Sequence, residues 1–74
     1  MREAHETLLK TICEELNRSE EPLTVAYLQQ KLKWRRDKVE SGLRWAVNQG
    51  YAVVGEAITI TPKAWDWWGE ECMS

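Results

Sequence analysis

A short central segment concentrates the positive charge of this chain. Residues 31–38, KLKWRRDK, contain five of the ten Lys and Arg side chains and one acidic side chain, Asp37. The segment therefore carries a net charge of +4, whereas the whole chain of 74 residues carries -2. Lys and Arg donate charge-assisted hydrogen bonds to phosphate groups. The segment is thus a candidate site for a polyanion.

The two ends of the chain carry the opposite charge. Residues 1–21 have a net charge of -3, and residues 62–74 have -2. A basic middle between acidic ends can orient a small domain on a phosphate backbone. Residues 1–74 are too few for a second core, so we expect one domain with its core over about residues 4–61 and a Trp-rich helix over about 62–72.

Three helices are expected before residue 50. Apolar residues recur at helical spacing over residues 4–16, and Thr24 is placed as the N-cap of a short second helix. After a turn over residues 33–36, Asp37 and Glu40 have the spacing of a capping box, so the third helix should begin near Asp37 or slightly before it. Gly50 should end that helix in a left-handed conformation. The expected inward face of the third helix is Val39, Leu43, Ala46 and Val47.

The period of the pattern changes after Gly50. Two runs of β-prone residues, 51–54 and 57–60, flank Gly55-Glu56 and predict a hairpin with a very short tip. Thr61 as cap and Pro62 at the first helical position predict a last helix, short and interrupted by Gly69. The fold class is α+β, in the order helix, helix, helix, hairpin, helix.

This order resembles the winged helix-turn-helix superfamily of DNA-binding domains over roughly Leu8 to Ala64. The segment PLTVAYLQQKL is similar to the second helix of such domains, and WRRDKVESGLRWAVNQGYAVV to the recognition helix with its glycine stop and the first wing strand. ITITPKAW is similar to the second wing strand and the start of a trailing helix. The resemblance implies a three-helix core, a β-hairpin wing and a C-terminal helix.

Two features depart from the superfamily pattern. The turn before the recognition helix usually has a small residue followed by Ser or Thr, whereas this chain has Lys33 and Arg35. The wing tip is Gly55-Glu56, which offers no cation to a minor groove and brings a carboxylate toward phosphates. The wing is therefore a weaker candidate for DNA contact than the helix.

The resemblance assigns the basic cluster to duplex DNA. First-turn residues of a recognition helix contact base edges, while flanking cations bind phosphates. We expect Arg36 and Lys38 at base edges, and Arg44 at the outer rim. The expected phosphate contacts are Lys31, Lys33 and Arg35, of which Arg35 is the best placed to turn toward bases, and Ser41 and Asn48 are further hydrogen-bonding candidates.

The five tryptophans suggest a second kind of contact. Trp34 is expected to pack between the second and third helices. Trp45 points about 140° from the buried direction of its helix, at 100° per residue, which suggests contact with the wing, a terminal helix or another subunit. One short helix is not expected to bury Trp65, Trp67 and Trp68, so a partner, most simply a second copy in a homodimer, is expected to cover some of them. The alternative is that they fold back on the first helix.

Nothing in the sequence predicts an enzyme or a cofactor. The single histidine, His5, is expected to be structural, and no Cys/His spacing suggests a metal site. Cys13 and Cys72 are expected to be free thiols, with Cys13 at the edge of the first apolar stripe. Glu14-Glu15 is expected on exposed surface, where nothing shifts a pKa toward acid–base chemistry.

The leading hypothesis is a small winged-helix DNA-binding protein, a transcriptional regulator, dimeric, binding duplex DNA with the helix that starts near Asp37. The alternative is a winged-helix module that binds a protein partner through exposed tryptophans and does not bind DNA. No apolar run reaches the roughly 20 residues needed to span a bilayer. A cytoplasmic location without membrane association is therefore expected.

Overall fold

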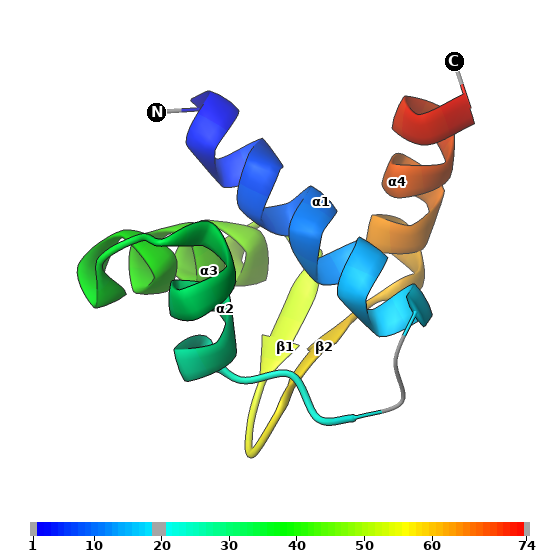
Figure 1. Cartoon of the computed structure of the whole chain (residues 1–74). Helices are drawn as coiled ribbons and strands as arrows, with labels where there is room; N and C mark the ends of the chain where they lie inside the picture. The colour runs from blue at the N-terminus through cyan, green and yellow to red at the C-terminus, as the bar shows by residue number, and fades with distance from the viewer. Residues whose placement is uncertain (1, 19–20, 74) are drawn as a thin grey trace.

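The computed structural model describes the backbone of residues 2–18 and 21–73 and the side chains of residues 4–18 and 21–70. The described chain forms four helices and a two-stranded antiparallel sheet (Figure 1). This confirms the α+β class and the predicted order of elements. The elements are α1 (Arg2–Arg18), α2 (Val25–Leu32), α3 (Arg36–Asn48), β1 (Ala52–Val54), β2 (Ile58–Ile60) and α4 (Pro62–Met73).

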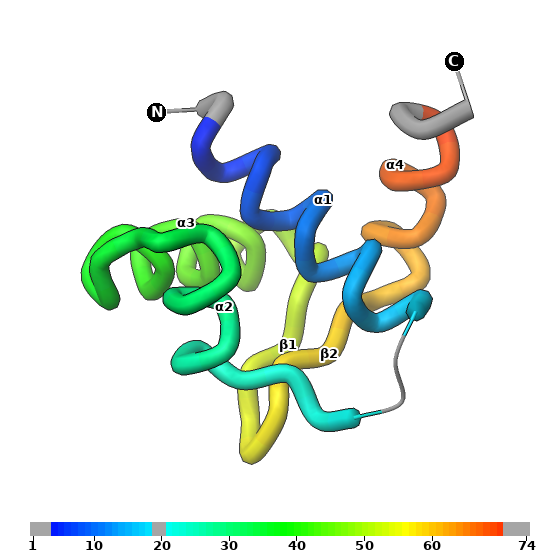
Figure 2. Tube along the Cα trace, in the orientation of Figure 1, coloured from blue at the N-terminus to red at the C-terminus, as the bar shows by residue number. Residues whose placement is uncertain are grey.

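Helix α1 is central to the packing and extends beyond the predicted residues 4–16 at both ends. It lies between α3 on one side and α4 on the other, with β2 beneath it (Figure 2). Leu8 and Ile12 face one core cluster, shared with α2 and α3. Leu9 and Cys13 face a second cluster, shared with α4. Cys13 is fully buried rather than at the edge of the stripe, and the side chain of Cys72 lies outside the described residues.

Helix α2 begins as predicted. The hydroxyl of Thr24 accepts a hydrogen bond from the backbone N–H of Tyr27 at 3.2 Å. Leu28 is fully buried between α1 and α3. The helix ends at Leu32, and Lys33 then adopts a left-handed conformation with φ 58°. That conformation is uncommon outside glycine, and it reverses the chain so that α3 can pack against α2.

The start of α3 agrees with the prediction, but its cap differs. The helix begins at Arg36, and its N-cap, Arg35, makes no side-chain capping hydrogen bond. The predicted capping box of Asp37 and Glu40 is wrong because both residues lie inside the helix, where Glu40 instead accepts from Arg36. Asp37 still favours the start of the helix, since a negative charge in the first turn complements the helix dipole.

The inward face of α3 is Val39, Gly42, Leu43 and Ala46. Val47, predicted to be buried, is 43% exposed. At Gly42 the helix approaches α1 so closely that a Cβ would overlap the Leu8 side chain. This close approach is why a glycine is accommodated in the middle of a helix. The chain leaves α3 through Gly50, whose φ of 79° confirms the predicted left-handed terminator.

The hairpin pairs Ala52 with Ile60, Val53 with Thr59 and Val54 with Ile58. On the far side of β2, the backbone N–H of Ile58 donates to the carbonyl of Leu23 at 2.9 Å, which ties the α1–α2 connection to the sheet.

Thr61 lies before Pro62 as predicted, but its hydroxyl donates to the carbonyl of Gly50 at 2.6 Å instead of capping α4. Helix α4 continues through Gly69 to Met73, so the predicted interruption is wrong.

Candidate nucleic-acid interface

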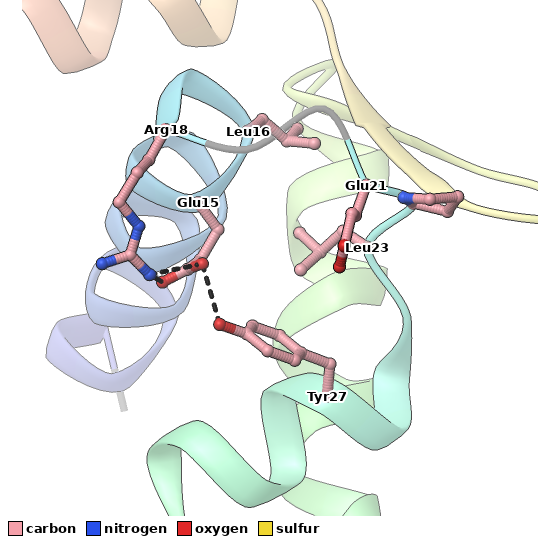
Figure 3. Close-up of a pocket in the computed structure, with 7 residues that line it drawn as sticks. Glu15, Leu16, Arg18, Glu21, Leu23 and Tyr27 are labelled. Atoms are coloured by element: carbon pink, nitrogen blue, oxygen red, sulfur yellow. Dashed lines mark hydrogen bonds and ion pairs between the residues drawn. The ribbon is translucent and has the colours of Figure 1, made fainter.

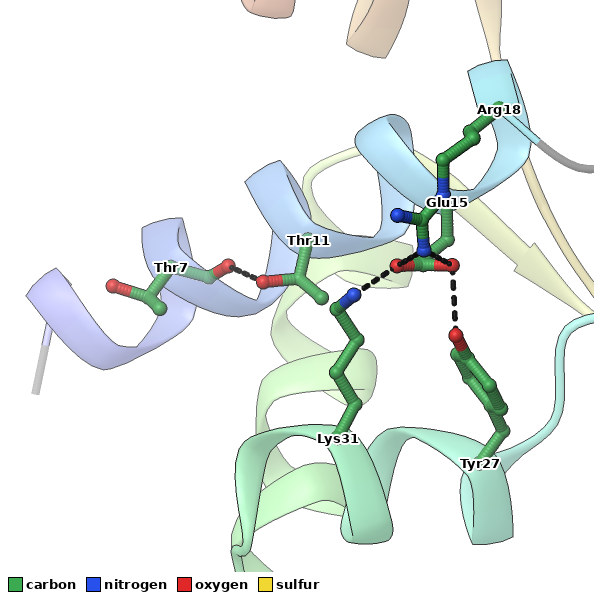
Figure 4. A network of polar contacts seen from close by, with 6 residues as sticks. All are labelled: Thr7, Thr11, Glu15, Arg18, Tyr27 and Lys31. Carbon is green, nitrogen blue, oxygen red and sulfur yellow. Dashed lines mark hydrogen bonds and ion pairs between the residues drawn. The ribbon is translucent and has the colours of Figure 1, made fainter.

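The first cation of the basic segment, Lys31, is paired with a carboxylate of the same chain, although its own side chain is 35% exposed. Its ammonium pairs with the carboxylate of Glu15 on α1, whose side chain is only 6% exposed (Figure 4). Arg18 Nη2 donates to both oxygens of the same carboxylate, at 2.7 and 2.9 Å. The hydroxyl of Tyr27 donates to Oε2 at 2.9 Å. One carboxylate therefore joins α1 to two residues of α2.

These donors hold the pKa of Glu15 at about 2, well below its ordinary 4.5. The hydrogen bond from Lys31 lowers the pKa most, and burial of the carboxylate opposes it; Arg18 and Tyr27 lower the pKa further. The expectation that Glu15 lies on exposed surface is therefore wrong, although its pKa is shifted away from the range useful for acid–base chemistry. The neighbours of Glu15 along the chain gave no signal for this, because Lys31 and Tyr27 come from α2.

A pocket of about 270 Å³ opens beside this network, between the end of α1 and the start of α2 (Figure 3). Glu15, Arg18 and Tyr27 contribute its polar wall, and Leu16 and Leu23 part of its apolar wall. The oxygens of Glu15 already accept from three side chains. A carboxylate so engaged, with a pKa of about 2, is unsuited to take up a proton near neutral pH.

The cations of the turn are placed differently from Lys31. Lys33 and Arg35 are exposed, and within the described residues neither side chain has an ion pair or a hydrogen bond. Both flank the N-terminal end of α3, where unsatisfied backbone N–H groups add a partial positive charge. Their guanidinium and ammonium groups are therefore available to an external anion.

Two further cations of the cluster have local partners at the surface. Arg36 Nε donates to Glu40 Oε1 at 2.9 Å, in a pair whose side chains are 70% and 45% exposed. Such an exposed pair one helical turn apart contributes only about 0.3–0.5 kcal/mol, so a phosphate can replace the carboxylate at little cost. Lys38 Nζ lies 4.2 Å from the ring centroid of Trp34. This cation–π contact does not neutralise the ammonium of Lys38, so its positive charge remains. Trp34 packs against the α1–α2–α3 core, as predicted.

The outward face of α3 continues this surface along the helix. Ser41, Arg44 and Asn48 are all exposed. Within the described part of the chain, Arg44 has no carboxylate partner. The predicted DNA-binding residues of the turn and of α3 thus lie together, at the N-terminal end of α3 and along its solvent-exposed face. Lys31 is separate from them, because it faces α1.

The remaining tryptophans pack within the chain. Trp45 stacks on His5 at a ring-centroid distance of 5.2 Å and contacts Tyr51 at 5.7 Å. His5 is half-buried in this contact, which agrees with a structural role. Trp45 therefore contacts both α1 and the base of the hairpin, two of the three contacts that its helix position suggested.

The tryptophans of α4 are half-buried against α1 and the hairpin base rather than fully exposed. Trp65 and Trp68 meet edge to face, with ring centroids 5.6 Å apart. Trp67 lies 6.2 Å from Tyr51. All three tryptophans of α4 therefore pack against their own chain. This is the arrangement that was the alternative to coverage by a second copy. The indole N–H of Trp68 is buried without a hydrogen-bond partner among the described residues.

The described residues contain neither a metal-binding cluster nor a membrane-spanning helix. No group of three or more His, Cys, Asp or Glu side chains is placed to hold a metal ion. Across residues 2–18 and 21–73, no helix has both the length and the apolar character needed to cross a bilayer.

Comparison of the chain with protein-family models, with curated proteins and with solved structures finds no match. The candidate interface is therefore defined by its own geometry: an exposed helix end and solvent face that carry Lys33, Arg35, Arg36, Lys38, Ser41 and Arg44.

Proposed function

We propose that this chain is a winged-helix protein that binds duplex DNA through the N-terminal end and solvent face of α3, and that it acts as a transcriptional regulator. In this proposal α2 and α3 form the helix-turn-helix unit, and β1 and β2 form the wing. The bridge between Leu23 and Ile58 adds a third, minimal strand to the wing base. This order of elements supports the winged-helix assignment.

The observation that carries the proposal is that cations around α3 are exposed and lack carboxylate partners among the described residues. These cations are Lys33, Arg35 and Arg44. A cation that already pairs with a carboxylate must give up that pair to bind a phosphate, whereas an exposed cation without a partner loses little, and its binding releases the counterions of the phosphate. Lys31 is removed from the proposed contacts because Glu15 occupies its ammonium.

Base contacts belong to the solvent face of α3. Arg36 and Arg44 have the fork of donors that pairs with guanine in a major groove. Glu40 can accept from cytosine once Arg36 has turned to a base or a phosphate. Glu56 at the exposed tip between β1 and β2 disfavours wing contacts with phosphate. In this proposal α3 and its preceding turn make the DNA contacts, and the wing does not.

The test is a titration of labelled duplex DNA of mixed sequence, followed by fluorescence anisotropy at 50 and 200 mM salt. About four or five phosphate contacts predict that affinity falls by roughly 100-fold or more between these salt concentrations. Replacing Lys33 and Arg35 together by Ala should weaken binding and reduce the salt slope by about two.

The matched control is Lys10→Glu, which lowers the net charge by the same two units at an exposed site on α1. This control should bind nearly as well as the parent. Equal losses for the two variants would show that only net charge matters and would exclude α3 as the site. No binding by the parent at 50 mM salt would exclude the function.

The alternative of a protein-binding module relied on exposed tryptophans. Those of α4 and α3 pack against their own chain. The large apolar side chains that do remain exposed include Val47, Val53 and Val54. A protein contact, if there is one, is therefore better sought at β1 than at α4.

A further inference from the structure

Two exposed valines border the face of α3 that is proposed to contact DNA. Among the described residues, the large hydrophobic side chains with more than two fifths of their surface exposed are Tyr27, Val47, Val53 and Val54. The hydroxyl of Tyr27 donates to Glu15, which accounts for its place at the surface. Val47 is in the last turn of α3, and Val54 ends β1. Phosphate contacts give neither valine a role.

Both valines line a groove of about 430 Å³ between α3, β1 and the start of α2, which we call the α3–β1 groove. Its apolar lining residues are Val25, Leu43, Val47 and Val54. Glu40 and Arg44 line the same groove, and both belong to the proposed DNA-binding face of α3. The α3–β1 groove is therefore continuous with the candidate interface and is not a separate site.

Val47 lies on the same side of α3 as the side chains that are proposed to contact bases. At 100° per residue, Val47 is rotated about the helix axis by about 20° from Arg36, and Glu40 by about 40°. Arg44 is rotated by about 80° from Arg36. Val47 is therefore inside the arc that runs from Arg36 to Arg44. A base-contacting face that includes both arginines includes Val47 as well.

The apolar side chain of Val47 restricts what it can contact on DNA. Most of the major-groove edge of a base pair consists of hydrogen-bond donors and acceptors. A valine that covered these groups would remove them from water without supplying a hydrogen bond, which is unfavourable. The large apolar group on that edge is the C5-methyl of thymine, and 5-methylcytosine carries the same methyl at the same ring position. The chemistry of Val47 therefore matches a pyrimidine C5-methyl group.

The side chain of Val47 is also held in a defined position. In a helix, a valine strongly prefers one χ1 rotamer, so little freedom is lost when its methyl groups meet a ligand. Leu43, one helical turn before Val47, is 4% exposed and packs in the core cluster shared with α1 and α2. Val47 is thus presented from a helix that is fixed in the core.

We propose that Val47 is a specificity-determining residue, which contacts a pyrimidine C5-methyl group in the major groove of duplex DNA. This inference rests on the proposed DNA contacts of α3, and it adds a sequence preference to them. Lys33 and Arg35 bind the phosphates of any duplex, whereas Val47 favours a duplex with a methyl group at the contacted position. Val54 only lines the far side of the α3–β1 groove.

The test compares three duplexes of one mixed sequence by fluorescence anisotropy at 50 mM salt. The first has natural bases, the second has uracil in place of every thymine, and the third has in addition 5-methylcytosine in place of every cytosine. The three share the same phosphates and the same hydrogen-bonding groups, so only methyl groups differ. Burial of one CH₂-sized group contributes about 0.8 kcal/mol, so the Kd of the parent should rise about 4-fold from the first duplex to the second.

The third duplex distinguishes the two sources of the methyl group. Weaker binding of the second duplex than of the first assigns the contact to thymine, and tighter binding of the third than of the second assigns it to 5-methylcytosine. In Val47→Ala either response should shrink to within about 1.5-fold, because the shortened side chain no longer reaches the methyl group. The response is a ratio of two Kd values for one protein, so it does not depend on the fraction of the variant that is folded.

The matched control is Val53→Ala, which removes the same atoms from a more exposed valine that does not line the α3–β1 groove. This control should keep the response of the parent. Equal Kd values of the parent for all three duplexes would overturn the inference and leave the proposed function standing. A response that Val47→Ala keeps, or that Val53→Ala loses, would overturn it as well. If the parent binds none of the duplexes, the proposed function fails and this inference fails with it.

Discussion

Replacing Glu15 by Gln removes the charge of the buried carboxylate while keeping its size and one of its acceptor oxygens. Each pKa unit corresponds to 1.36 kcal/mol. The fall in the pKa of Glu15 from 4.5 to about 2 therefore corresponds to at most about 3.4 kcal/mol of folding free energy at neutral pH. We expect Glu15→Gln to lower the free energy of unfolding at pH 7 by about 2–3 kcal/mol.

The pH dependence of this difference has a defined sign. Because the folded state lowers the pKa, the stabilisation is fully present above pH 4.5 and is lost as the pH falls toward 2. The gap in stability between the parent and Glu15→Gln should then shrink to below about 1 kcal/mol at pH 2. Other carboxylates titrate in the same range, but they do so in both proteins and cancel in the difference.

Urea denaturation followed by tryptophan fluorescence at pH 7, 4, 3 and 2 measures this gap. Glu14→Gln is the matched control, since Glu14 is exposed and has no ion pair among the described residues. It should change stability by less than about 0.5 kcal/mol at any of these pH values. A gap for Glu15→Gln that stays constant from pH 7 to pH 2 would refute the assignment of Glu15 as a charged link between α1 and α2.

The glycines give two further predictions, both measured as urea unfolding free energies. Gly42→Ala should destabilise the fold by about 1 kcal/mol, because its methyl group would overlap the fully buried Leu8 side chain and the cost of overpacking exceeds the gain in helix propensity. Gly69→Ala, with no atom within 4 Å of the added Cβ, should instead stabilise α4 by about 0.5–1 kcal/mol. If Gly42→Ala and Gly69→Ala changed the unfolding free energy in the same direction, the packing of α1 on α3 would be contradicted. Gly50→Ala should cost about 1 kcal/mol through its φ of 79°, and Gly50→Asn less; no loss with Ala would show that α3 does not end as described.

The sequence predicted the features that depend on neighbours along the chain. The spacing of apolar residues located the helices, Thr24 marked the start of α2, and Gly50 marked the end of α3, because each of these signals is read within one or two helical turns. The two β-prone runs on either side of Gly55-Glu56 located the hairpin for the same reason.

The features that the sequence did not predict depend on contacts between distant residues. Glu15 was assigned to the surface because its three donors include Tyr27 and Lys31, which only the packing of α2 on α1 brings near. Lys31 was grouped with the DNA-binding cations because charge density along the chain does not show which side of α2 a cation faces. Val47 was assigned to the core from its spacing along the helix, but its side chain is 43% exposed, because spacing alone does not show how far the packed surface extends.

The local signals also failed where two of them competed. The capping box was predicted from Asp37 and Glu40, but the left-handed conformation of Lys33 shortens the turn and starts α3 at Arg36. Gly69 was expected to interrupt the last helix, yet contacts of α4 with α1 and β2 carry the helix through it. In both cases tertiary packing outweighed a weak local preference.

Backbone amide chemical shifts, followed during titration of the isotopically labelled chain with duplex DNA at low salt, test the proposed function most directly. The account predicts that the largest changes fall on residues 33–44, with small changes on α4 and on the hairpin tip. Changes centred on α4 or on the tip, or none at a DNA excess, would contradict it.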